Sequence, residues 1–246
     1  MTDPVNRTIL LFDIEQYGSR DDVEQAYLRR VLYDVTDATL GAASVDDIAH
    51  LRADRGDSVM ELIDTRISVP ALVKTLLTET PALLHSKNRL LASSAQMRLR
   101  IVLSSGYVAV DDLDGWVGSD LNHAVRLLNS DPLRDALKER DSDSVLCVSD
   151  GIYQGVVRHG PLGVRPGDFH RITVPTKEGP TVAWLHGEPR ATKSLGTPTG
   201  AAPASDTPLP AHHVVHINGD QYGQAGGTLH GDQHFDFTRS VRDERR

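Results

Sequence analysis

The sequence contains one cysteine, few aromatic residues and no long hydrophobic run, and each scarcity excludes a class of protein. Cys147 lies inside the apolar stretch Val145-Leu146-Cys147-Val148, so a disulfide framework is excluded and we expect a packed thiol in a reducing compartment. No apolar run approaches the roughly 20 residues that span a bilayer. The start, Met1-Thr2-Asp3-Pro4, lacks the basic and apolar regions of a signal peptide. We therefore expect a soluble, cytoplasmic protein with no membrane partner.

Positive charge is also scarce. The 246 residues include 26 Lys and Arg against 34 Asp and Glu, which gives a formal net charge of −8. Proteins that bind nucleic acid generally do so through clustered Lys and Arg, so this balance argues against a nucleic-acid partner. Any phosphate bound here is expected to need the help of a metal ion.

Strand-like β-branched runs alternate with helical patterns through the first three quarters of the chain. The turn at residues 17–19 predicts a helix capped by Ser19, with Val23, Tyr27, Val31 and Val35 facing the core. Residues 72–91 are predicted to form one helix, or two interrupted near Pro81. A further helix is predicted to begin at Ser119 or Asp120 and to run through Leu128, and a short helix is predicted at residues 132–138. The predicted strands are residues 9–12, 48–53, 58–63, 97–104, 107–110, 144–148, 169–174 and 181–185. This order favours an α+β palm that resembles a ferredoxin-like sheet, with helices on one face.

The composition divides the chain into three parts. Residues 1–187 form the predicted folded domain. Residues 188–211 are rich in Pro, Ala and Thr and are too poor in apolar side chains to order themselves, so they are predicted to be a flexible linker. Residues 212–246 contain a short repeat, with His216-Ile217-Asn218-Gly219-Asp220-Gln221 echoed by His230-Gly231-Asp232-Gln233. We expect this short, β-rich tail to serve in oligomerisation or in binding a protein partner.

Two acidic residues carry most of the information about function. Asp13 ends the apolar run Thr8-Ile9-Leu10-Leu11-Phe12, and Asp57 lies in the turn Arg55-Gly56-Asp57-Ser58 of a predicted hairpin. Carboxylates at a strand end and in an adjacent hairpin turn can meet and hold Mg²⁺ against a triphosphate. The pair predicts a nucleotide-handling protein.

A third segment, residues 113–128, adds polar groups suited to nucleotide chemistry. Asn122 and Arg126 are four residues apart, so on a helix they project from the same face. The amide can orient a ribose oxygen, and the planar guanidinium can contact phosphate.

With these residues in view, residues 7–186 resemble the catalytic domain of class III nucleotidyl cyclases, the adenylate and guanylate cyclase family. Phe12-Asp13-Ile14 with Tyr17-Gly18 resembles the opening motif of that family, and Gly56-Asp57-Ser58 resembles its second metal-aspartate turn. The segment from Gly118 to Arg126 resembles its Gly, Asn, Ala, Arg helix.

The resemblance implies a site and a mechanism. Asp13 and Asp57 would hold two Mg²⁺ or Mn²⁺ ions, Asn122 would position the ribose, and Arg126 would stabilise charge in the transition state. The implied reaction is attack of the ribose 3′ oxygen on the α-phosphorus of a nucleoside triphosphate, which yields a 3′,5′-cyclic nucleotide for intracellular signalling and releases pyrophosphate. In that family the site lies between two chains, so the resemblance also implies a homodimer. Further substrate-binding positions would be Phe12, Ala53, Gly115 and Lys177, the last resembling a triphosphate-binding lysine of a late hairpin.

Two of these positions depart from the family pattern. Purine cyclases carry hydrogen-bonding side chains where this chain has Ala53 and Gly115, neither of which can read a base edge. A one-residue slip in the alignment would put Asp54 and Asp114 there instead. Bacterial defence cyclases that make cyclic CMP or cyclic UMP form a divergent branch of the same family. Members of that branch are not expected to carry a purine-reading pair of side chains. The sequence leaves the choice of base open, and with it a role in antiviral defence.

A non-enzymatic alternative stays open as well. The chain could be an inactive cyclase-fold module that binds nucleotide or only dimerises, with its repeated tail recruiting a partner. The order of Asp13, Asp57, Asn122 and Arg126 favours the enzyme, because a scaffold has no need for two facing carboxylates. The loss of recognisable base-reading side chains favours the scaffold.

Overall fold

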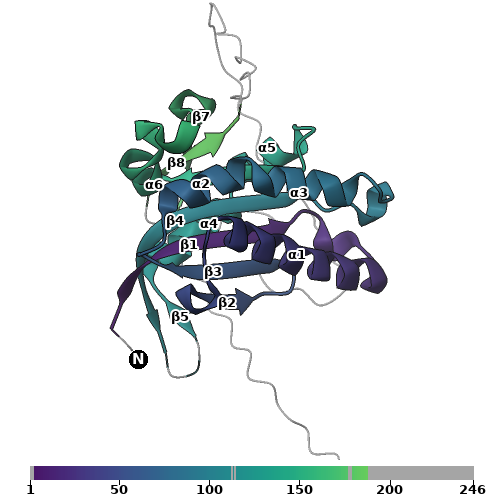
Figure 1. Cartoon of the computed structure of the whole chain (residues 1–246), viewed down its shortest axis with the longest axis horizontal. Coiled ribbons are helices and arrows are strands. Elements are labelled where there is room, and N and C mark those ends of the chain that lie inside the picture. Colours follow the sequence, from purple (N-terminus) through teal and green to yellow (C-terminus); the bar gives the residue numbers. More distant parts are fainter. Residues whose placement is uncertain (1–2, 112, 114, 177–178, 188–246) are drawn as a thin grey trace, which may run out of the picture. The chain divides into compact units, whose positions relative to one another are not determined.

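The computed structural model describes residues 3–187 except residues 112, 114, 177 and 178. They form one eight-stranded sheet with helices packed on both faces (Figure 1). The strands are β1 (Val5–Ile14), β2 (His50–Asp54), β3 (Ser58–Asp64), β4 (Leu99–Val110), β5 (Trp116–Val117), β6 (Ser144–Ser149), β7 (Phe169–Val174) and β8 (Thr181–His186). Their order is β2-β3-β1-β4-β6-β8-β7, and β5 pairs with β4 outside this path.

Most of the strand pairs are antiparallel, which confirms the predicted α+β class. β1 runs antiparallel to both β3 and β4, and the β4–β6 pair is parallel. The register places Asp13 opposite Ser58 on β3 and opposite Arg100 on β4. Residues of three strands, β3, β1 and β4, therefore lie side by side at the C-terminal end of β1.

The helices are α1 (Asp22–Ala42), α2 (Val69–Leu77), α3 (Glu79–Asn88), α4 (Ser119–Leu128), α5 (Asp131–Lys138) and α6 (Asp150–Gly155). The prediction that they cover one face was wrong. Leu10 and Phe12 point into a core formed with α1, α2, α3 and α6, whereas Ile9 and Leu11 point into a second core formed with α4 and α5. Alternate residues of a strand face opposite sides, so a strand as apolar as β1 is covered on both.

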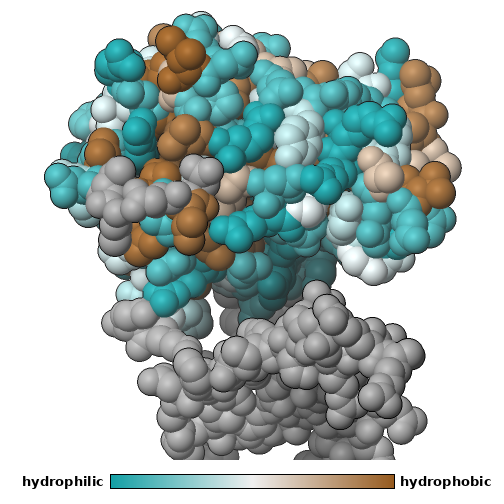
Figure 2. Space-filling model, turned by 90° about the horizontal axis from the view of Figure 1, so that it is seen from below, coloured by the Kyte–Doolittle hydropathy of each residue, from teal (hydrophilic) through white to brown (hydrophobic). Residues whose placement is uncertain are grey.

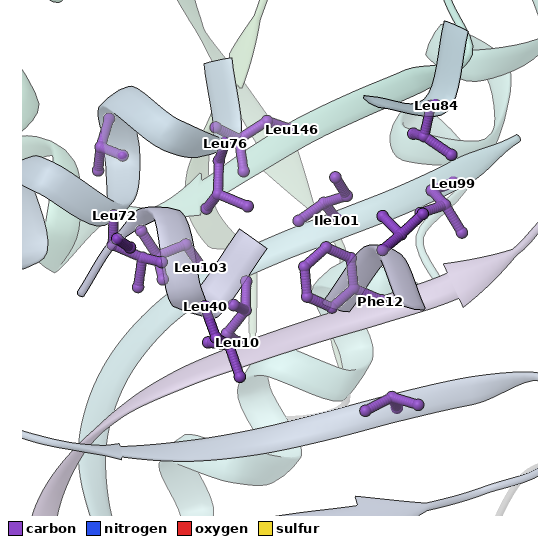
Figure 3. Close-up of a cluster of buried hydrophobic side chains, with 14 of the residues drawn as sticks. Leu10, Phe12, Leu40, Leu72, Leu76, Leu84, Leu99, Ile101, Leu103 and Leu146 are labelled. Atoms are coloured by element: carbon purple, nitrogen blue, oxygen red, sulfur yellow. The ribbon is translucent and has the colours of Figure 1, made fainter. Parts of the chain in front are cut away.

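The larger core joins the sheet to α1, α2, α3 and α6 (Figure 3). Phe12 and Ile101 lie on neighbouring strands, and Leu72 and Leu76 of α2 belong to the same core, with Leu72 near Leu103 and Leu76 near Leu146. All six are fully buried or nearly so. This core holds the end of β1 rigidly from behind, while the carboxylate of Asp13 projects from the opposite face.

The structure corrects the predicted start and face of α1. Its N-cap is Asp21, whose side chain accepts a hydrogen bond from the Glu24 N–H in a capping box, and Ser19 belongs to the preceding turn. Val31 and Val35 are buried as predicted, but Val23 is 79% exposed and Tyr27 is 37% exposed. Leu28, Leu32 and Leu40 are the other apolar residues of its buried stripe.

Several boundaries also differ from the prediction. The break between α2 and α3 lies at Thr78, and Pro81 is in the first turn of α3, where its missing N–H has no consequence. The two strands predicted on either side of Gly106 are one continuous strand, β4. The short elements α6 and β5 were not predicted.

Lys177, the linker at residues 188–211 and the tail at residues 212–246 lie outside the described residues, so the predictions made for them stay predictions. Within the part of the chain that the structure describes, no helix combines the length and the apolar character needed to cross a membrane.

Candidate functional site

Asp13 and Asp57 meet at the junction of β1 with the β2–β3 turn. Ile14 N–H, next to Asp13, donates to the carbonyl of Asp57 at 3.0 Å, and Asp13 pairs with Ser58 in the sheet register. Asp13 is 7% exposed, and Asp57 is half-buried. The turn thus brings the backbone of Asp57 beside the end of β1, near enough for its charge to act on Asp13.

Arg100 on β4 forms an ion pair with Asp13. Its Nε donates to Asp13 Oδ2 at 2.8 Å, and its Nη2 donates to the same oxygen. The two side chains are only 13% and 9% exposed. Because a buried carboxylate needs a partner, Arg100 stabilises Asp13 in this state of the protein.

The electrostatics of Asp13 reflect this crowding. Burial has the largest effect and raises the pKa of Asp13 above its usual value, and the nearby negative charge of Asp57 raises it further. Arg100 and, more weakly, Arg134 of α5 act in the opposite direction. Two carboxylates that repel each other in a partly buried place form a position where added positive charge is favoured.

The donor set suits a hard divalent cation that also binds a substrate. Carboxylate oxygens are the ligands that Mg²⁺ and Mn²⁺ prefer, and Mg²⁺ is commonly held by one or two carboxylates plus substrate phosphates. Among the described residues, no group of three or more His, Cys, Asp or Glu side chains gathers to enclose a metal ion. Asp13 and Asp57 would therefore share a cation with oxygens that the protein does not supply.

The predicted helix over residues 119–128 is present as α4. Leu121, Ala124 and Leu127 are buried against the sheet, whereas Asn122 and Arg126 are exposed on the opposite stripe. The two polar residues share one face, as their spacing requires. That face points away from the sheet that carries Asp13, so within one chain the structure does not bring the two halves of the predicted site together.

Gly118 sets where α4 begins. A Cβ on this residue would lie 2.5 Å from the carbonyl oxygen of Tyr107. The start of α4 can approach β4 this closely only because residue 118 has no side chain. The position of Asn122, one turn later, depends on that approach.

The positions expected to read the base carry no hydrogen-bonding side chain. Ala53 pairs with Met60 and lies on the same face of the sheet as Asp13. The neighbouring Asp54 lies on the other face. There, Tyr33 Oη donates to the Asp54 carboxylate at 2.7 Å, and Arg29 forms an ion pair with the same carboxylate. Burial acts to raise the pKa of Asp54, but its hydrogen-bond donors hold that pKa below the usual value.

Gly115 lies against the carboxylate of Asp111. Its N–H donates to Asp111 Oδ1 at 2.6 Å, and a Cβ would lie 2.5 Å from Asp111 Oδ2. The backbone N–H of Asp111 also donates to the carbonyl of Gly115 at 2.8 Å, which closes the turn before β5. Gly115 itself offers no side chain to a base, and a larger residue at this position would require the Asp111 carboxylate to move.

Phe12 was predicted to contact substrate. Its side chain is fully buried in the core on the α1 side of the sheet, opposite the face of Asp13. Any contact of Phe12 with a ligand would have to come from its backbone.

Sequence reasoning missed Arg100 and Arg134. The available signal for Arg100 was a charged residue within the apolar run from Leu99 to Leu103. A buried position of that kind calls for an anionic partner. No comparable signal marks Arg134, because an arginine in a short amphipathic helix is ordinary.

Comparison with known proteins supports the fold directly. The sequence matches no protein-family model and no curated protein at a significant level. Among solved structures, a bacterial light-regulated adenylyl cyclase superposes with a TM-score of 0.53 and 15% identity, over 75% of this chain and 91% of that one. The guanylyl cyclase Cya2 superposes with a TM-score of 0.52 and 14% identity, over 78% and 96%. The described part of the chain therefore has the fold of class III adenylate and guanylate cyclase catalytic domains.

Proposed function

We propose that this protein is a nucleotidyl cyclase that converts a ribonucleoside triphosphate to a 3′,5′-cyclic nucleotide and pyrophosphate. The observation that carries the proposal is the pairing of Asp13 with Asp57 at one sheet junction, on a cyclase fold. The fold alone does not require a second carboxylate there, and the mutual repulsion of the two groups opposes their placement. Divalent-cation binding explains why both are present.

The residues of the chain have distinct roles in this proposal. Asp13 and Asp57 would hold Mg²⁺ or Mn²⁺, two ions in the proposed active state. Bound there, the cations would lower the pKa of the ribose 3′ hydroxyl and neutralise the triphosphate. Asn122 would orient the ribose, and Arg126 would stabilise the charge that develops on the α-phosphate during in-line attack.

The outward stripe of α4 supports a homodimeric site. Because Asn122 and Arg126 face away from their own sheet, they would complete the site of a second copy. Large apolar side chains are exposed at the start of β1 and around the β4–β5 hairpin: Val5 is 49% exposed, Tyr107 59%, Leu113 90% and Val117 51%. Figure 2, seen from the side on which β2 and β5 lie, shows apolar side chains interrupting the polar surface. Exposed apolar groups of this kind suit a protein interface.

A second candidate is a catalytically inactive module that binds nucleotide or dimerises and recruits a partner through residues 212–246. Ala53 and Gly115 favour it, since neither offers a hydrogen bond to a base. The paired aspartates favour the enzyme.

Incubation with each of the four ribonucleoside triphosphates separates the two. We expect the purified protein with Mn²⁺ or Mg²⁺ to form a cyclic nucleotide from at least one of them, detected by mass spectrometry. Asp57→Asn should abolish the product. Asp54→Asn is the matched control, because it changes a carboxylate of the same hairpin that faces α1. Absence of product from all four triphosphates would favour the inactive module.

A further inference from the structure

Glu61 of β3 is a buried acidic residue that the proposed mechanism does not use. Its side chain is 0% exposed. It shares a face of β3 with Val59 and Ile63, which belong to the core on the α1 side of the sheet, opposite the face of Asp13. Burying a carboxylate is costly, and apolar side chains in place of a buried ion pair are often neutral or stabilising. Stability of the core alone therefore does not explain a glutamate at residue 61.

Among the described residues, the hydrogen-bond partners of the Glu61 carboxylate come from β2, the neighbouring strand at the edge of the sheet (Figure 1). Arg52 lies opposite Glu61 in the register and donates from Nε to Glu61 Oε1 at 2.5 Å. His50 Nδ1 lies 2.7 Å from Glu61 Oε2. Burial has the largest effect and raises the pKa of Glu61, whereas Arg52 and His50 act to lower it. Each oxygen of the carboxylate thus has a partner on the same strand.

The guanidinium of Arg52 also reaches α1. Its Nη2 donates to Asp37 at 2.6 Å, and its Cζ lies over the Tyr33 ring, 5.1 Å from the ring centroid. The Asp37 side chain is 62% exposed, however, whereas that of Glu61 is fully buried. Because exposed ion pairs contribute little stability, Glu61 is the partner that holds Arg52 in place.

Apolar burial does little to fix the register of β2. None of its five residues is buried, and Leu51 is 42% exposed. A shift of a strand by one residue turns every side chain to the other face, and weakly buried strands specify their register weakly. Such a shift would put Leu51 or Ala53 opposite Glu61 and leave its carboxylate without a partner. A buried charge that is satisfied in one register only is a means of specifying that register.

The register of β2 bears on the candidate site through Ala53 and through the turn that follows. In the observed register, Ala53 lies on the face of Asp13. The turn leads through Asp57 to β3, and the Asp57 carbonyl accepts a hydrogen bond from the Ile14 N–H. That bond and the pairing of β3 with β1 hold one end of the turn. The other end is held by β2.

We propose that Glu61 is a positioning residue of the candidate site, which acts through Arg52 and His50 to hold β2 in the register that aligns Ala53 and the turn of Asp57. The inference rests on the proposed function, since it assigns to Glu61 the alignment of that same site. Glu61 acts from the opposite face of the sheet and contacts neither the cation nor the substrate.

Hydrogen exchange of the full chain, followed by mass spectrometry, tests the hold on β2. Glu61→Gln keeps the shape of the side chain but removes the charge that Arg52 requires. We expect the protected amides of residues 50–58 to exchange at least about tenfold faster, because a hydrogen bond to a charged group shifts a local opening equilibrium by about that factor or more. The amides of β7, the strand at the other edge of the sheet, should keep their wild-type rates.

The affinity for Mn²⁺, followed by electron paramagnetic resonance, tests the effect on the site. Glu61→Gln should weaken it by about three- to tenfold, because Asp57 is no longer held in one place. Arg52→Lys should act in the same way, since an ammonium group lacks the planar donors that reach Glu61 and Asp37 together. Asp37→Asn is the matched control in the same network and should change neither measurement, because the side chain of Asp37 is exposed.

Two further variants separate positioning from stability. Glu61→Met combined with Arg52→Met removes both charges together, so the melting temperature should stay near that of the wild type. Exchange of the β2 amides should still be faster, and Mn²⁺ should still bind more weakly. Thr80→Ala has the opposite pattern. It removes a buried hydroxyl that is hydrogen-bonded to Thr39 of α1 at 2.9 Å, so it should lower the melting temperature and leave β2 exchange and Mn²⁺ affinity unchanged.

Each outcome decides one question. If Glu61→Gln does not fold, the double variant still gives both measurements. Wild-type exchange or wild-type Mn²⁺ affinity in the double variant would overturn the proposal, as would equal effects from Thr80→Ala. If the wild-type protein neither binds Mn²⁺ nor cyclises a triphosphate, the proposed function fails, and faster exchange in Glu61→Gln would still show that Glu61 holds β2. If the wild-type protein is an active cyclase and Glu61→Gln matches it in both measurements, the role of Glu61 alone fails.

Discussion

Mixing two inactive variants should restore activity if the site is shared between subunits. Asp57→Asn removes a cation ligand while keeping the shape of the side chain. Arg126→Ala removes the guanidinium from the outward stripe of α4. Each variant alone should be inactive, because in a homodimer of either one both sites lack a required group.

The expected recovery follows from the symmetry of the dimer. In a mixed dimer, one site combines the intact Asp57 of one chain with the intact Arg126 of the other, and the second site lacks both. Random pairing of equal amounts makes about half of the dimers mixed, each with one working site of two, so about a quarter of the wild-type activity should return. If the site were built within one chain, no pairing would create an intact site.

The assay is co-expression of the two variants with different affinity tags, followed by measurement of cyclic nucleotide in the unfractionated protein and in the doubly purified mixed dimer. The doubly purified fraction should reach about half of the wild-type activity. Co-expression of Asp57→Asn with Asp13→Asn is the matched negative control, since both changes remove cation ligands from the same half of the site and no pairing restores it. A mixed dimer of Asp57→Asn and Arg126→Ala that stays as inactive as this control would refute the shared site.

Three other changes have outcomes that the structure specifies. Gly118→Ala should lower the free energy of unfolding by about 1–3 kcal/mol and reduce cyclase activity, because the new Cβ would meet the Tyr107 carbonyl and shift α4. Chemical denaturation measures the first effect, and the cyclase assay measures the second. Burial raises the pKa of the Cys147 thiol to about 12, so the folded state keeps the proton and a thiol reagent at about pH 8 should label Cys147 only after unfolding; rapid labelling of native protein would contradict this. Deleting residues 188–246 should leave the melting temperature of the remaining domain nearly unchanged but alter the mass measured by light scattering, and an unaltered mass would count against a role of the tail in assembly.

Local sequence patterns predicted those elements whose signals are periodic. The helix α4 was predicted with its boundaries because its apolar residues recur at helical spacing and Gly118 precedes it. The strand β6 was predicted because a short apolar run between polar segments has few other places in a fold. The stripe of α1 was misjudged because Val23 and Tyr27 fit the same four-residue spacing as Val31. Only packing shows that the first turns of α1 extend beyond the core.

Pairings between distant strands could not be predicted from local patterns. The contact of Arg100 with Asp13 depends on β4 lying antiparallel to β1 in one particular register, and those residues are 87 positions apart. A shift of that register by one residue would turn Arg100 to the other face. The sequence indicated a metal-cation site at Asp13. It did not show that the guanidinium of Arg100, from the same chain, forms an ion pair with that carboxylate.

The hairpin of β2 and β3 shows how strand geometry decides a question that alignment left open. By sequence count residue 53 matches a base-reading position and residue 54 would match it after a one-residue slip, but the two side chains project from opposite faces of β2. Ala53 shares the face of Asp13, and Asp54 is committed to Tyr33 and Arg29 of α1. Because the side-chain period of a strand is two, no small adjustment can bring Asp54 to the site without turning every other residue of β2 over. In this register the Asp54 side chain is therefore not available to a base held beside Asp13. Ala53→Lys would place a hydrogen-bonding cation on that face, and it should change the ratio of products formed from the four triphosphates more than Asp54→Lys does.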